Sequence, residues 1–402
     1  METEIIGKET LLNAARFLVE GGHVAVPTET VYGLACNGLN RRAVQNLYEI
    51  KGRPAVRPIS LMVSGPQAMD QYCRSVPQSA RLLAERFWPG PLTIVLEANT
   101  ELVPDVVRAG GETVGLRCPD HPLTRKLLSL CDVPLAVPSA NPTGSPSPKT
   151  AEEVRRYFDG KIEAIIDGGP CGIGRESTVI DLSRTPYRIL RRGALDEDVI
   201  ADALMRGMTI IGITGGTGAG KTTALGVLRE MGAFAIDCDD VYHALLRNNS
   251  QLVSELGARF PGTVTDGELQ RKALGEIVFS DAVSLRDLNA IAHRYVRAEV
   301  IRLLREHAMA GGTLAAIDAV ELFEGDLAAL CTVTVGVTAQ EDIRIRRIMR
   351  REGVSEPYAR SRARAQKPDE YYVSKCDMTL RNNGSEAEFA GKCRDIFGGM
   401  KK

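Results

Sequence analysis

Apolar and polar residues follow helical and strand periods in turn along the first half of the chain. Residues 10–20 predict a helix that a pair of glycines ends, with one apolar face made of Leu11, Leu12, Ala15, Leu18 and Val19. Short apolar runs predict strands at 23–27, 59–63, 92–96, 113–117, 164–166 and 178–181. Helical segments separate these runs, and this order is typical of an α/β or α+β domain that contains many loops.

The pattern starts afresh near residue 207. A short polar helix predicted over 196–206 ends at Gly207, and residues 209–213 then form a continuous apolar strand. The strands predicted from this point on are 209–213, 233–237, 313–318, 331–337 and 378–381. Because helical segments alternate with them, we expect a doubly wound parallel sheet. We therefore predict two domains, residues 1–206 and residues 207–402.

Composition narrows the class of protein. The chain has 402 residues, 44% of them hydrophobic and 25% charged, with a net charge of −1, which is typical of globular chains with two or three domains. No apolar run approaches the roughly 20 residues that span a bilayer, and the acidic Met-Glu-Thr-Glu start is unlike a signal peptide. The nine Cys lack a C-x-x-C pair, which disfavours a zinc site or a disulfide framework. We expect a cytoplasmic protein with reduced thiols and no membrane contact.

A glycine-rich segment opens the second half. Residues 215–222 read Gly-Gly-Thr-Gly-Ala-Gly-Lys-Thr and fit the phosphate-binding pattern G-x-x-x-x-G-K-[ST]. The glycines let backbone N–H groups turn toward phosphate oxygens, and the next helix directs its positive end at the same place. Lys221 then reaches the β and γ phosphates, and the Thr222 hydroxyl is placed to ligate Mg²⁺. A glycine turn without a ligand is the alternative, but the strand before the segment and the helix after it favour phosphate binding.

Acidic residues follow the next predicted strand. Asp237, Asp239 and Asp240 lie at its carboxyl end, where parallel sheets bind their ligands. A carboxylate there is able to accept the proton of an attacking hydroxyl or to hold Mg²⁺. The structural alternative is that Asp239 or Asp240 caps a helix over 241–246.

Arginines crowd a later segment. Those that follow the strand at 331–337 are Arg344, Arg346, Arg347, Arg350, Arg351, Arg360, Arg362 and Arg364. Few acids stand at the i+4 positions that would pair with them. A solvated face is one interpretation, and a mobile lid that brings arginines to a transferred phosphoryl group is the other. The phosphate loop favours the lid.

Over residues 209–397, the second half resembles dephospho-CoA kinase. The segments that carry the resemblance are 212–220, 236–239, 266–274, 288–293, 347–353 and 382–384. It implies a P-loop kinase that uses ATP and Mg²⁺ to phosphorylate the 3′-hydroxyl of dephospho-CoA, the last step of coenzyme A biosynthesis. In the family, the acid that matches Asp239 is the base, and the arginine that matches Arg347 belongs to the lid.

The same resemblance implies roles for further residues of this half. Lys221 and Arg347 join Asp239 as catalytic residues, and Arg271 and His293 lie on the dephospho-CoA side. The residues expected to bind ATP are Gly215, Gly216, Thr217, Gly218, Ala219, Gly220, Lys221, Thr222, Thr223 and Asn383, with Thr222 as the metal ligand. Glu321 departs from the family, because it stands in an apolar place of the usual Pro-Leu-Leu-Phe-Glu segment. This departure predicts weakened or altered acceptor contacts.

The first half carries small polar and basic residues in blocks, without an evident nucleophile. The block at 27–34 follows a predicted strand, and the block at 51–58 contains Lys51, Arg53 and Arg57. Three cations in seven residues, stiffened by prolines, predict a rigid loop that binds an anion. A solvated surface loop is the alternative.

Together, these blocks resemble the YrdC family of threonylcarbamoyl-AMP synthases over about residues 5–195. The matching blocks are 27–34, 51–58, 88–93, 117–119, 139–141, 176–179 and 190–193. The resemblance implies a twisted mixed sheet with an open concave face. It also implies that the domain condenses L-threonine, bicarbonate and ATP to threonylcarbamoyl-AMP and pyrophosphate, the first step toward a modified adenosine (t6A) beside the tRNA anticodon.

The resemblance also distributes the site residues between two sides. The residues expected to hold ATP are Lys51, Arg53, Ser139, Asn141 and Arg191, and those expected on the threonine and bicarbonate side are Thr30, Tyr32, Arg117 and Ser177. A carbamate oxygen attacks the α-phosphorus, so the chemistry needs positioning and charge neutralisation rather than a protein nucleophile. Transfer RNA, or the complex that completes its modification, is a further expected partner.

The chain is therefore predicted to be a fusion of two enzymes. The alternative for the first half is a binding module whose basic concave face recognises double-stranded RNA by shape. The alternatives for the second half are a kinase of another small molecule and a regulatory nucleotide-binding domain in which Glu321 marks lost acceptor binding.

Overall fold

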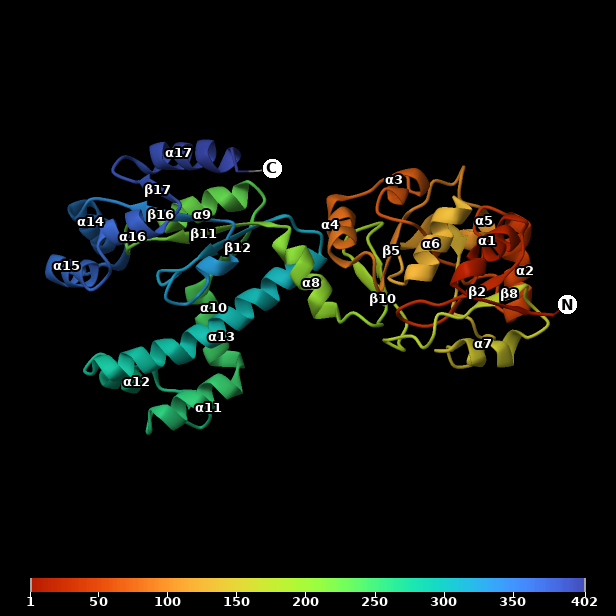
Figure 1. Ribbon diagram of the computed structural model, residues 1–402. Helices are drawn as coiled ribbons and strands as arrows, with labels where there is room; N and C mark the ends of the chain where they lie inside the picture. Colours follow the sequence, from red (N-terminus) through yellow and green to blue (C-terminus); the bar gives the residue numbers. More distant parts are fainter. Residues whose placement is uncertain (1, 401–402) are drawn as a thin grey trace. The chain divides into compact units, whose positions relative to one another are not determined.

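The computed structural model describes residues 2–400 and divides into two compact units (Figure 1). The N-terminal unit runs to Gly207 and includes residues 309–311, and the C-terminal unit begins at Met208. None of the helices within the described residues is both long enough and apolar enough to cross a membrane.

A mixed sheet forms the centre of the N-terminal unit. Within the described residues it has ten strands, in the order β1-β8-β2-β3-β7-β4-β6-β5-β9-β10. The strands are β1 (Glu4–Ile6), β2 (Val24–Val26), β3 (Gly33–Asn37), β4 (Leu61–Met62), β5 (Leu92–Glu97), β6 (Thr113–Arg117), β7 (Leu135–Ala136), β8 (Ala164–Ile166), β9 (Thr178–Asp181) and β10 (Arg188–Arg191). Parallel pairs such as β5 with β9 and antiparallel pairs such as β5 with β6 occur in the same sheet. The predicted mixed sheet is confirmed.

Helices connect these strands at points that the local sequence dictates. They are a 3-10 turn η1 (Lys8–Thr10), α1 (Leu11–Val19), α2 (Arg41–Lys51), α3 (Ala68–Tyr72), α4 (Gln78–Phe87), α5 (Asp105–Arg108), α6 (Pro122–Cys131), α7 (Ala151–Phe158) and α8 (Glu197–Arg206). The Asn40 side chain caps α2 by accepting the N–H groups of Arg42 and Ala43, and Gly52 ends it with φ at 57°. This stop makes Lys51 the last residue of α2.

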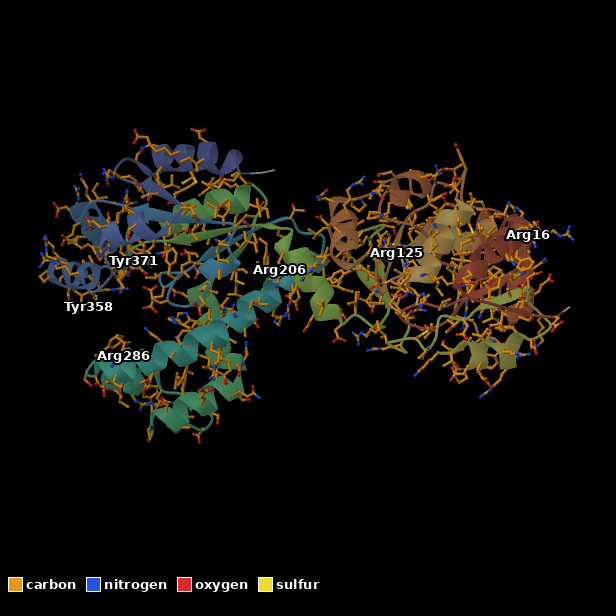
Figure 2. The ribbon with its side chains drawn as sticks, in the orientation of Figure 1. Arg16, Arg125, Arg206, Arg286, Tyr358 and Tyr371 are labelled. Atoms are coloured by element: carbon orange, nitrogen blue, oxygen red, sulfur yellow. The ribbon has the colours of Figure 1, made fainter. Side chains whose placement is uncertain are left out.

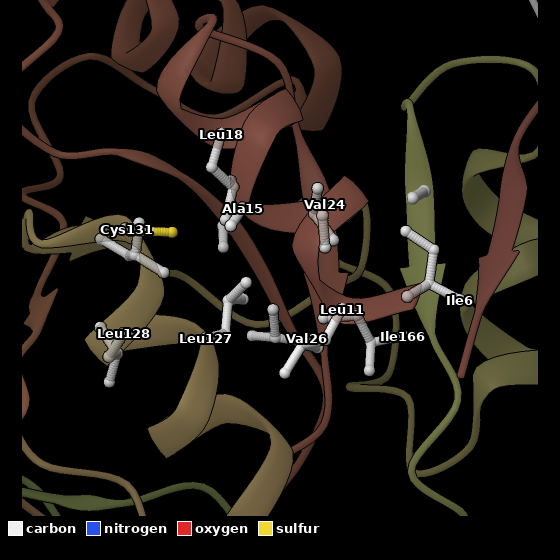
Figure 3. Packing of buried hydrophobic residues seen from close by; sticks show 14 of the residues in the cluster. Ile6, Leu11, Ala15, Leu18, Val24, Val26, Leu127, Leu128, Cys131 and Ile166 are labelled. Carbon is white, nitrogen blue, oxygen red and sulfur yellow. The ribbon is translucent and has the colours of Figure 1, made fainter. Parts of the chain in front are cut away.

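The core of the N-terminal unit lies between the sheet and the helices α1 and α6. Figure 3 shows Leu11, Ala15 and Leu18 of α1 facing Val24 and Val26 of β2, with Leu127 and Leu128 of α6 in the same cluster. All these side chains are buried, whereas Leu12 and Val19, which we also predicted on the apolar face of this helix, are exposed. Each buried large apolar side chain contributes about 1.5–3 kcal/mol to folding, so this cluster fixes the edge of the sheet that carries β1, β8 and β2.

A parallel sheet forms the centre of the C-terminal unit. In the described part of the chain it has five strands, in the order β12-β15-β11-β16-β17. The strands are β11 (Thr209–Thr214), β12 (Phe234–Asp237), β15 (Leu314–Asp318), β16 (Val333–Thr338) and β17 (Met378–Arg381), with a separate hairpin of β13 (Val264–Thr265) and β14 (Glu268–Leu269). All pairs in the sheet are parallel, as predicted.

Helices cover both faces of this sheet, as in a doubly wound fold. They are α9 (Lys221–Glu230), α10 (Cys238–Asn248), α11 (Ser250–Arg259), α12 (Arg271–Val278), α13 (Ala282–Met309), a 3-10 turn η2 (Ala328–Leu330), α14 (Glu341–Glu352), α15 (Glu356–Arg364), α16 (Asp369–Lys375) and α17 (Glu386–Gly398). The helices α9 and α17 pack against each other on one side of the sheet (Figure 1). Phe389 and Phe397 of α17 are buried there against Leu225 and Leu228 of α9.

One helix begins earlier than the sequence pattern predicts. The structural alternative, in which Asp239 or Asp240 caps a helix over 241–246, is wrong, because α10 begins at Cys238 and Asp237 is its cap. The Asp237 carboxylate accepts the backbone N–H groups of Asp239 and Asp240 at 2.9 and 3.3 Å. Asp239 and Asp240 therefore lie in the first turn of α10 rather than at its cap.

Strand order brings the carboxyl ends of β11, β12 and β15 together. In the register of the sheet, Asp318 at the end of β15 pairs with Asp237 on one side and with Ile213 on the other. Because β11 runs directly into the glycine-rich segment, the two aspartates lie beside it. Ligands of parallel sheets bind at such an edge.

The two units are expected to fold independently when the chain is cut near residue 207. Each unit has its own sheet and its own buried cluster, so each retains the interactions that stabilise it. Fragments 1–206 and 207–402 should both be soluble and should both give cooperative thermal unfolding transitions by circular dichroism. Two unfolded fragments beside a folded whole chain would contradict this prediction.

Candidate active sites

The N-terminal unit contains a cavity of about 550 Å³ that is rich in basic side chains. Among its lining residues are the predicted site residues Tyr32, Lys51, Arg53, Arg117, Ser139, Asn141, Ser177 and Arg191. The lining comes from the loops and strand ends around β3, β5, β6, β7, β9 and β10, which are far apart in sequence but adjacent in the sheet. Thr30 does not line the cavity itself but bonds to Arg117. The structure thus places the predicted residues at one site.

Lys51 is a buried cation on this cavity. Its side chain is 3% exposed, and Nζ donates hydrogen bonds to the backbone carbonyls of Ser139, at 2.5 Å, and of Asn141. Burial, together with the nearby Arg53 charge, lowers the Lys51 pKa to about 8. The amine is therefore protonated at neutral pH but poorly solvated, and an incoming phosphate would restore the lost charge stabilisation.

Arg53 holds the loop that follows Lys51 through hydrogen bonds to backbone carbonyls of the same loop. Arg53 donates from Nε to the Arg57 carbonyl at 3.2 Å and from Nη2 to the Pro58 carbonyl at 2.8 Å. Tyr48 donates to the same Arg57 carbonyl at 2.8 Å. These bonds fold the segment back on itself, which fits the predicted rigid loop.

Two further residues present polar groups to the cavity. Asn141 donates from Nδ2 to the Ser145 carbonyl at 2.6 Å, while its buried Oδ1 has no hydrogen-bond partner among the described residues. That oxygen is suited to accept a ligand donor. The Tyr32 hydroxyl accepts the Gly168 N–H at 3.2 Å and donates to the Gly169 carbonyl at 2.8 Å. Burial raises the Tyr32 pKa to about 12, so this hydroxyl stays protonated.

Two arginines are held at the cavity by acids. Arg117 is 7% exposed, and its Nη2 lies 2.6 Å from the Glu29 carboxylate. Arg191 lies on β10, with Nη1 2.6 Å from Glu176 and with Nε and Nη2 bonded to the Ser177 carbonyl at 3.0 and 2.9 Å. Each guanidinium is thus fixed in direction before any ligand arrives.

The glycine-rich segment of the C-terminal unit adopts a backbone that other residues would strain. Gly215, Gly218 and Gly220 have φ values of 144°, 80° and 112°. A Cβ at Gly215 would lie 2.2 Å from the Val337 carbonyl oxygen, so the loop packs directly on β16. Helix α9 begins at Lys221, immediately after the loop, as predicted. This is the geometry of a phosphate-binding loop at a helix N-terminus.

Residues from the arginine-rich region hold the outside of this loop. Arg344 donates to the Thr217 carbonyl at 3.1 Å, and Arg347 donates to the Gly218 carbonyl at 3.3 Å. Gln366 both accepts the Thr217 N–H at 2.6 Å and donates to the Thr217 hydroxyl at 2.7 Å. The region therefore contacts the phosphate loop directly, which the lid interpretation requires.

Acids do pair with these arginines, mostly outside the i+4 spacing considered from the sequence. Figure 2 shows the side chains of this region, with Tyr358 labelled on α15. Arg362 and Arg364 of α15 pair with Glu352 and Glu341 of the neighbouring helix α14. Arg360 also pairs with Glu356, four residues earlier in α15, at 2.8 Å. The pairs of Arg362 and Arg364 cross between helices, so a comparison of i+4 neighbours does not find them.

An acidic group lies beside the phosphate loop. Asp318 is 8% exposed, and burial raises the pKa of its carboxyl group to about 6. The nearby positive charge of Lys221 lowers this pKa, but its effect is smaller than that of burial. The negative charges of Asp237 and Asp239 also raise the Asp318 pKa. Asp239 itself is exposed in the first turn of α10, and Thr222 is exposed in the first turn of α9. The structure thus gathers Lys221 and these three acids at one edge of the sheet.

A second cavity, of about 600 Å³, begins at this acidic group. Its lining includes Asp239, Tyr242, His293, Glu321, Glu324, Gln366 and Lys367. His293 and Glu321 form an ion pair at 2.9 Å, and this contact lowers the Glu321 pKa. Arg271 does not line the cavity, but its charge acts on the Tyr242 phenol. Although the family pattern has an apolar residue at this position, the Glu321 side chain is 47% exposed and pairs with His293. Altered acceptor contacts stay a prediction.

Asn383 and its neighbour occupy different places. The Asn383 carboxamide accepts the backbone N–H of Gln340 at 3.0 Å, at the start of α14. Asn382 instead donates to the Ala219 carbonyl at 2.8 Å and accepts from Arg347 at 3.1 Å. Asn382 is therefore the residue of this pair that touches the phosphate loop, and an ATP contact of Asn383 stays a prediction.

Comparison with known proteins connects both cavities to families. Residues 16–193 match the family model of Sua5, YciO and YrdC, whose description is "Telomere recombination". Threonylcarbamoyl-AMP synthase from Pyrococcus abyssi is 49% identical over 182 residues, which cover 45% of this chain and 53% of that protein. Threonylcarbamoyl-AMP synthase from Marinobacter nauticus is 34% identical over 169 residues, which cover 42% of this chain and 89% of that protein. The chain belongs to the Sua5, YciO and YrdC family.

A second family model matches the second half of the chain. Residues 209–388 match the family model for dephospho-CoA kinase, so the chain carries a dephospho-CoA kinase domain after its Sua5/YrdC domain. A crystal structure of P. abyssi Sua5 complexed with L-threonine is 29% identical, with a TM-score of 0.49, and covers 80% of this chain and 93% of that chain. The chain spans about half the length of several curated relatives that it matches. Both predicted resemblances are confirmed.

Four site residues were missed by sequence reasoning. Glu29, Thr93 and Glu176 contact the arginines and hydroxyls of the Sua5/YrdC cavity, and Asp318 lies beside the kinase phosphate loop. Glu29 and Glu176 each directly precede a predicted site residue, which is a usable signal. Asp318 is a single acid after an apolar strand, and only the strand order gives it significance.

The kinase site fits Mg²⁺ by its donor chemistry. The Thr222 hydroxyl and the carboxylates near Lys221 are hard oxygen donors, which Mg²⁺ prefers. Within residues 2–400, no group of three or more His, Cys, Asp or Glu side chains is arranged to hold a metal ion alone.

Asp318→Asn is expected to stabilise the nucleotide-free protein at pH 7. Burial raises this carboxyl pKa from 3.8 to about 6, so the folded state holds the proton more tightly, and stability falls as pH rises from about 4 to about 6. Above that window the buried charge costs on the order of 2–3 kcal/mol, which Asn removes. Urea unfolding of both proteins at pH 7 and pH 4 measures the effect. The advantage of the variant should shrink at pH 4, and an equal advantage at both values would contradict the assignment.

Proposed function

We propose that the chain is a bifunctional enzyme that makes threonylcarbamoyl-AMP in its Sua5/YrdC domain and phosphorylates dephospho-CoA in its kinase domain. The observation that carries the proposal is the pair of cavities, each built from its own set of charged residues. Both reactions use ATP, whose phosphates would meet the cations of the first cavity in one domain and the glycine-rich loop with Lys221 in the other.

The N-terminal cavity supports adenylate formation by its distribution of charge. Lys51, Arg53 and Arg191 supply positive charge for a triphosphate, and Arg117 supplies a separate cation for a carboxylate. The amine of L-threonine and bicarbonate give a carbamate and water, and a carbamate oxygen then attacks the α-phosphorus of ATP. The new P–O bond forms as the bond to pyrophosphate breaks, and the surrounding cations stabilise the charge that develops on both groups. The product is an adenylate that a tRNA-modifying step would consume.

The C-terminal cavity supports phosphoryl transfer to a hydroxyl. A ribose 3′-hydroxyl in the cavity attacks the γ-phosphorus of ATP held by the loop, the bond to ADP breaks, and the hydroxyl proton passes to a carboxylate. Asp239 is the carboxylate shared by the cavity lining and the acidic group. Lys221 and Arg347 carry the positive charge beside the transferred group. Mg²⁺, when bound by Thr222 and the phosphates, would screen the phosphate charge.

Two assays on the intact chain test the proposal. Pyrophosphate release should require L-threonine, bicarbonate and ATP together, and ADP release should require dephospho-CoA. Release in the absence of any one substrate, or no turnover at all, would contradict the corresponding half. Tight binding of duplex RNA without pyrophosphate release would instead favour the binding-module alternative, and turnover with a different phosphate acceptor would redefine the kinase.

Lys51→Ala and Arg53→Ala are each expected to reduce threonylcarbamoyl-AMP formation strongly. Loss of a charge-assisted phosphate contact in a shielded site costs on the order of 2–4 kcal/mol, which is roughly 30- to 900-fold in kcat/KM. Because the Lys51 pKa is about 8, the KM for ATP of the unaltered chain should also rise as pH increases through that value. Lys126→Ala, at an exposed lysine of α6, is the control and should change neither reaction.

For this pair of variants, dephospho-CoA phosphorylation by the same preparation should be unchanged. Normal pyrophosphate release in both variants would return the loop at 51–58 to the solvated-surface alternative.

Asp239→Asn is expected to lower the turnover of dephospho-CoA phosphorylation by about 10²-fold or more, while ATP binding stays nearly intact. Asn keeps the shape of the side chain but removes its basicity, whereas ATP is held by the loop, Lys221 and Mg²⁺. Asp240→Asn is the matched control, since both acids are exposed in the first turn of α10 and only Asp239 lines the acceptor cavity. Steady-state CoA formation and ATP titration measure the two effects. An equal loss in both variants would assign Asp239 to the helix start alone.

A further inference from the structure

Two of the arginines that line the N-terminal cavity, Arg117 and Arg191, are held by the same local arrangement. Arg117 is bonded to the Glu29 carboxylate at 2.6 Å and to the hydroxyl of the next residue, Thr30, at 2.8 Å. Arg191 is bonded to the Glu176 carboxylate at 2.6 Å and to the hydroxyl of the next residue, Ser177, at 2.9 Å. A glutamate followed by a hydroxyl residue thus clamps each guanidinium from two neighbouring positions.

Each glutamate is itself anchored through its other oxygen. Glu29 Oε2 accepts the backbone N–H of Asp120 at 3.0 Å, while its Oε1 faces Arg117. Glu176 Oε1 accepts the Ser147 hydroxyl at 2.8 Å, while its Oε2 faces Arg191. A carboxylate fixed at both oxygens cannot rotate, so it determines the direction of the arginine that it binds.

The clamp on Arg117 leaves donors for a ligand. A guanidinium carries five N–H donors. Within residues 2–400, the hydrogen bonds of Arg117 to Glu29, Thr30 and Gly90 engage its Nη2 and Nε groups. Its Nη1 group is therefore the part that a bound anion would meet. An arginine held in this way loses less side-chain freedom when the anion binds than a free one would.

The two clamps differ in burial. The Arg117 and Glu29 side chains are 8% and 13% exposed, whereas those of Arg191 and Glu176 are 46% and 34% exposed. A buried cation without its partner is strongly disfavoured, and water weakens an exposed pair. We expect the larger effect at Glu29.

We propose that Glu29 and Glu176 are positioning residues of the synthase site: Glu29 directs Arg117 toward the carboxylate of the amino acid, and Glu176 directs Arg191 toward the phosphates of ATP. This inference rests on the proposed synthase function. It adds that the two substrates are positioned through separate acids, so loss of either acid affects one substrate and not the other.

Steady-state kinetics of Glu29→Gln and Glu176→Gln in the full chain test this separation. Gln keeps the size of each side chain and removes its charge. Glu29→Gln should raise the KM for L-threonine by about 30-fold or more and leave the KM for ATP within about twofold. Glu176→Gln should raise the KM for ATP by about 5- to 10-fold and leave the KM for L-threonine within about twofold. Glu85→Gln, at an exposed position of α4, is the control and should change neither constant.

The outcomes separate this inference from the proposed function. An unaltered chain that releases no pyrophosphate removes the proposed function itself. Unchanged constants in both variants, or an equal rise of both constants in one variant, would overturn the positioning roles, because a merely structural role does not distinguish the substrates. If circular dichroism shows that Glu29→Gln does not fold, Glu29→Asp is the second variant. Its shorter side chain keeps the negative charge but places the carboxylate farther from Arg117. That variant should still raise only the KM for L-threonine, and a rise in the KM for ATP as well would equally overturn the inference.

Discussion

At both sites of this chain, cationic side chains are buried away from water and must still be able to bind an anion. Desolvation of a cation costs free energy, so each buried cation needs oxygen partners that are permanent but weaker than the ligand. Lys51 meets this constraint through two backbone carbonyls, and Arg117 meets it through Glu29. Arg344, which is 5% exposed, has Asp369 at 3.6 Å and the Thr217 carbonyl at 3.1 Å. At each of these residues the surrounding fold supplies the oxygens that the buried cation needs.

The two domains meet the same constraint in different ways. The Sua5/YrdC cavity draws its cations from strand ends and loops that are distant in sequence, so the mixed order of its sheet is what assembles the site. The kinase site uses one continuous segment, in which the backbone of 215–220 and the start of α9 supply the positive potential. A site of the first kind depends on the packing of the whole sheet, whereas a site of the second kind is already largely encoded by one strand, one loop and one helix.

This difference explains which parts the sequence predicted. The phosphate loop, the five strands of the parallel sheet in the described chain and the residues of the basic cavity followed from local patterns or from resemblance. Asp318 was missed because one acid after an apolar strand has no local signature, and its burial arises from the two strands beside it. The cap of α10 was misplaced because apolar periodicity begins later than the helical hydrogen bonds, which Asp237 initiates. The ion pairs between α14 and α15 were likewise not predicted, because the spacing of residues within one helix does not show which residues of a neighbouring helix they contact.

Glu321 shows how a departure from a family pattern acquires meaning only in three dimensions. From the sequence, an acid in an apolar place indicated damage to the acceptor side. In the structure its carboxylate pairs with His293 at 2.9 Å, and this contact with the nearby Lys367 charge favours its ionised form. The acid is therefore partly neutralised by residues of the same cavity rather than buried without a partner. It still adds negative charge close to Asp239, so an acceptor that carries phosphates must place them toward basic residues and present its hydroxyl, the uncharged part, to the acidic edge.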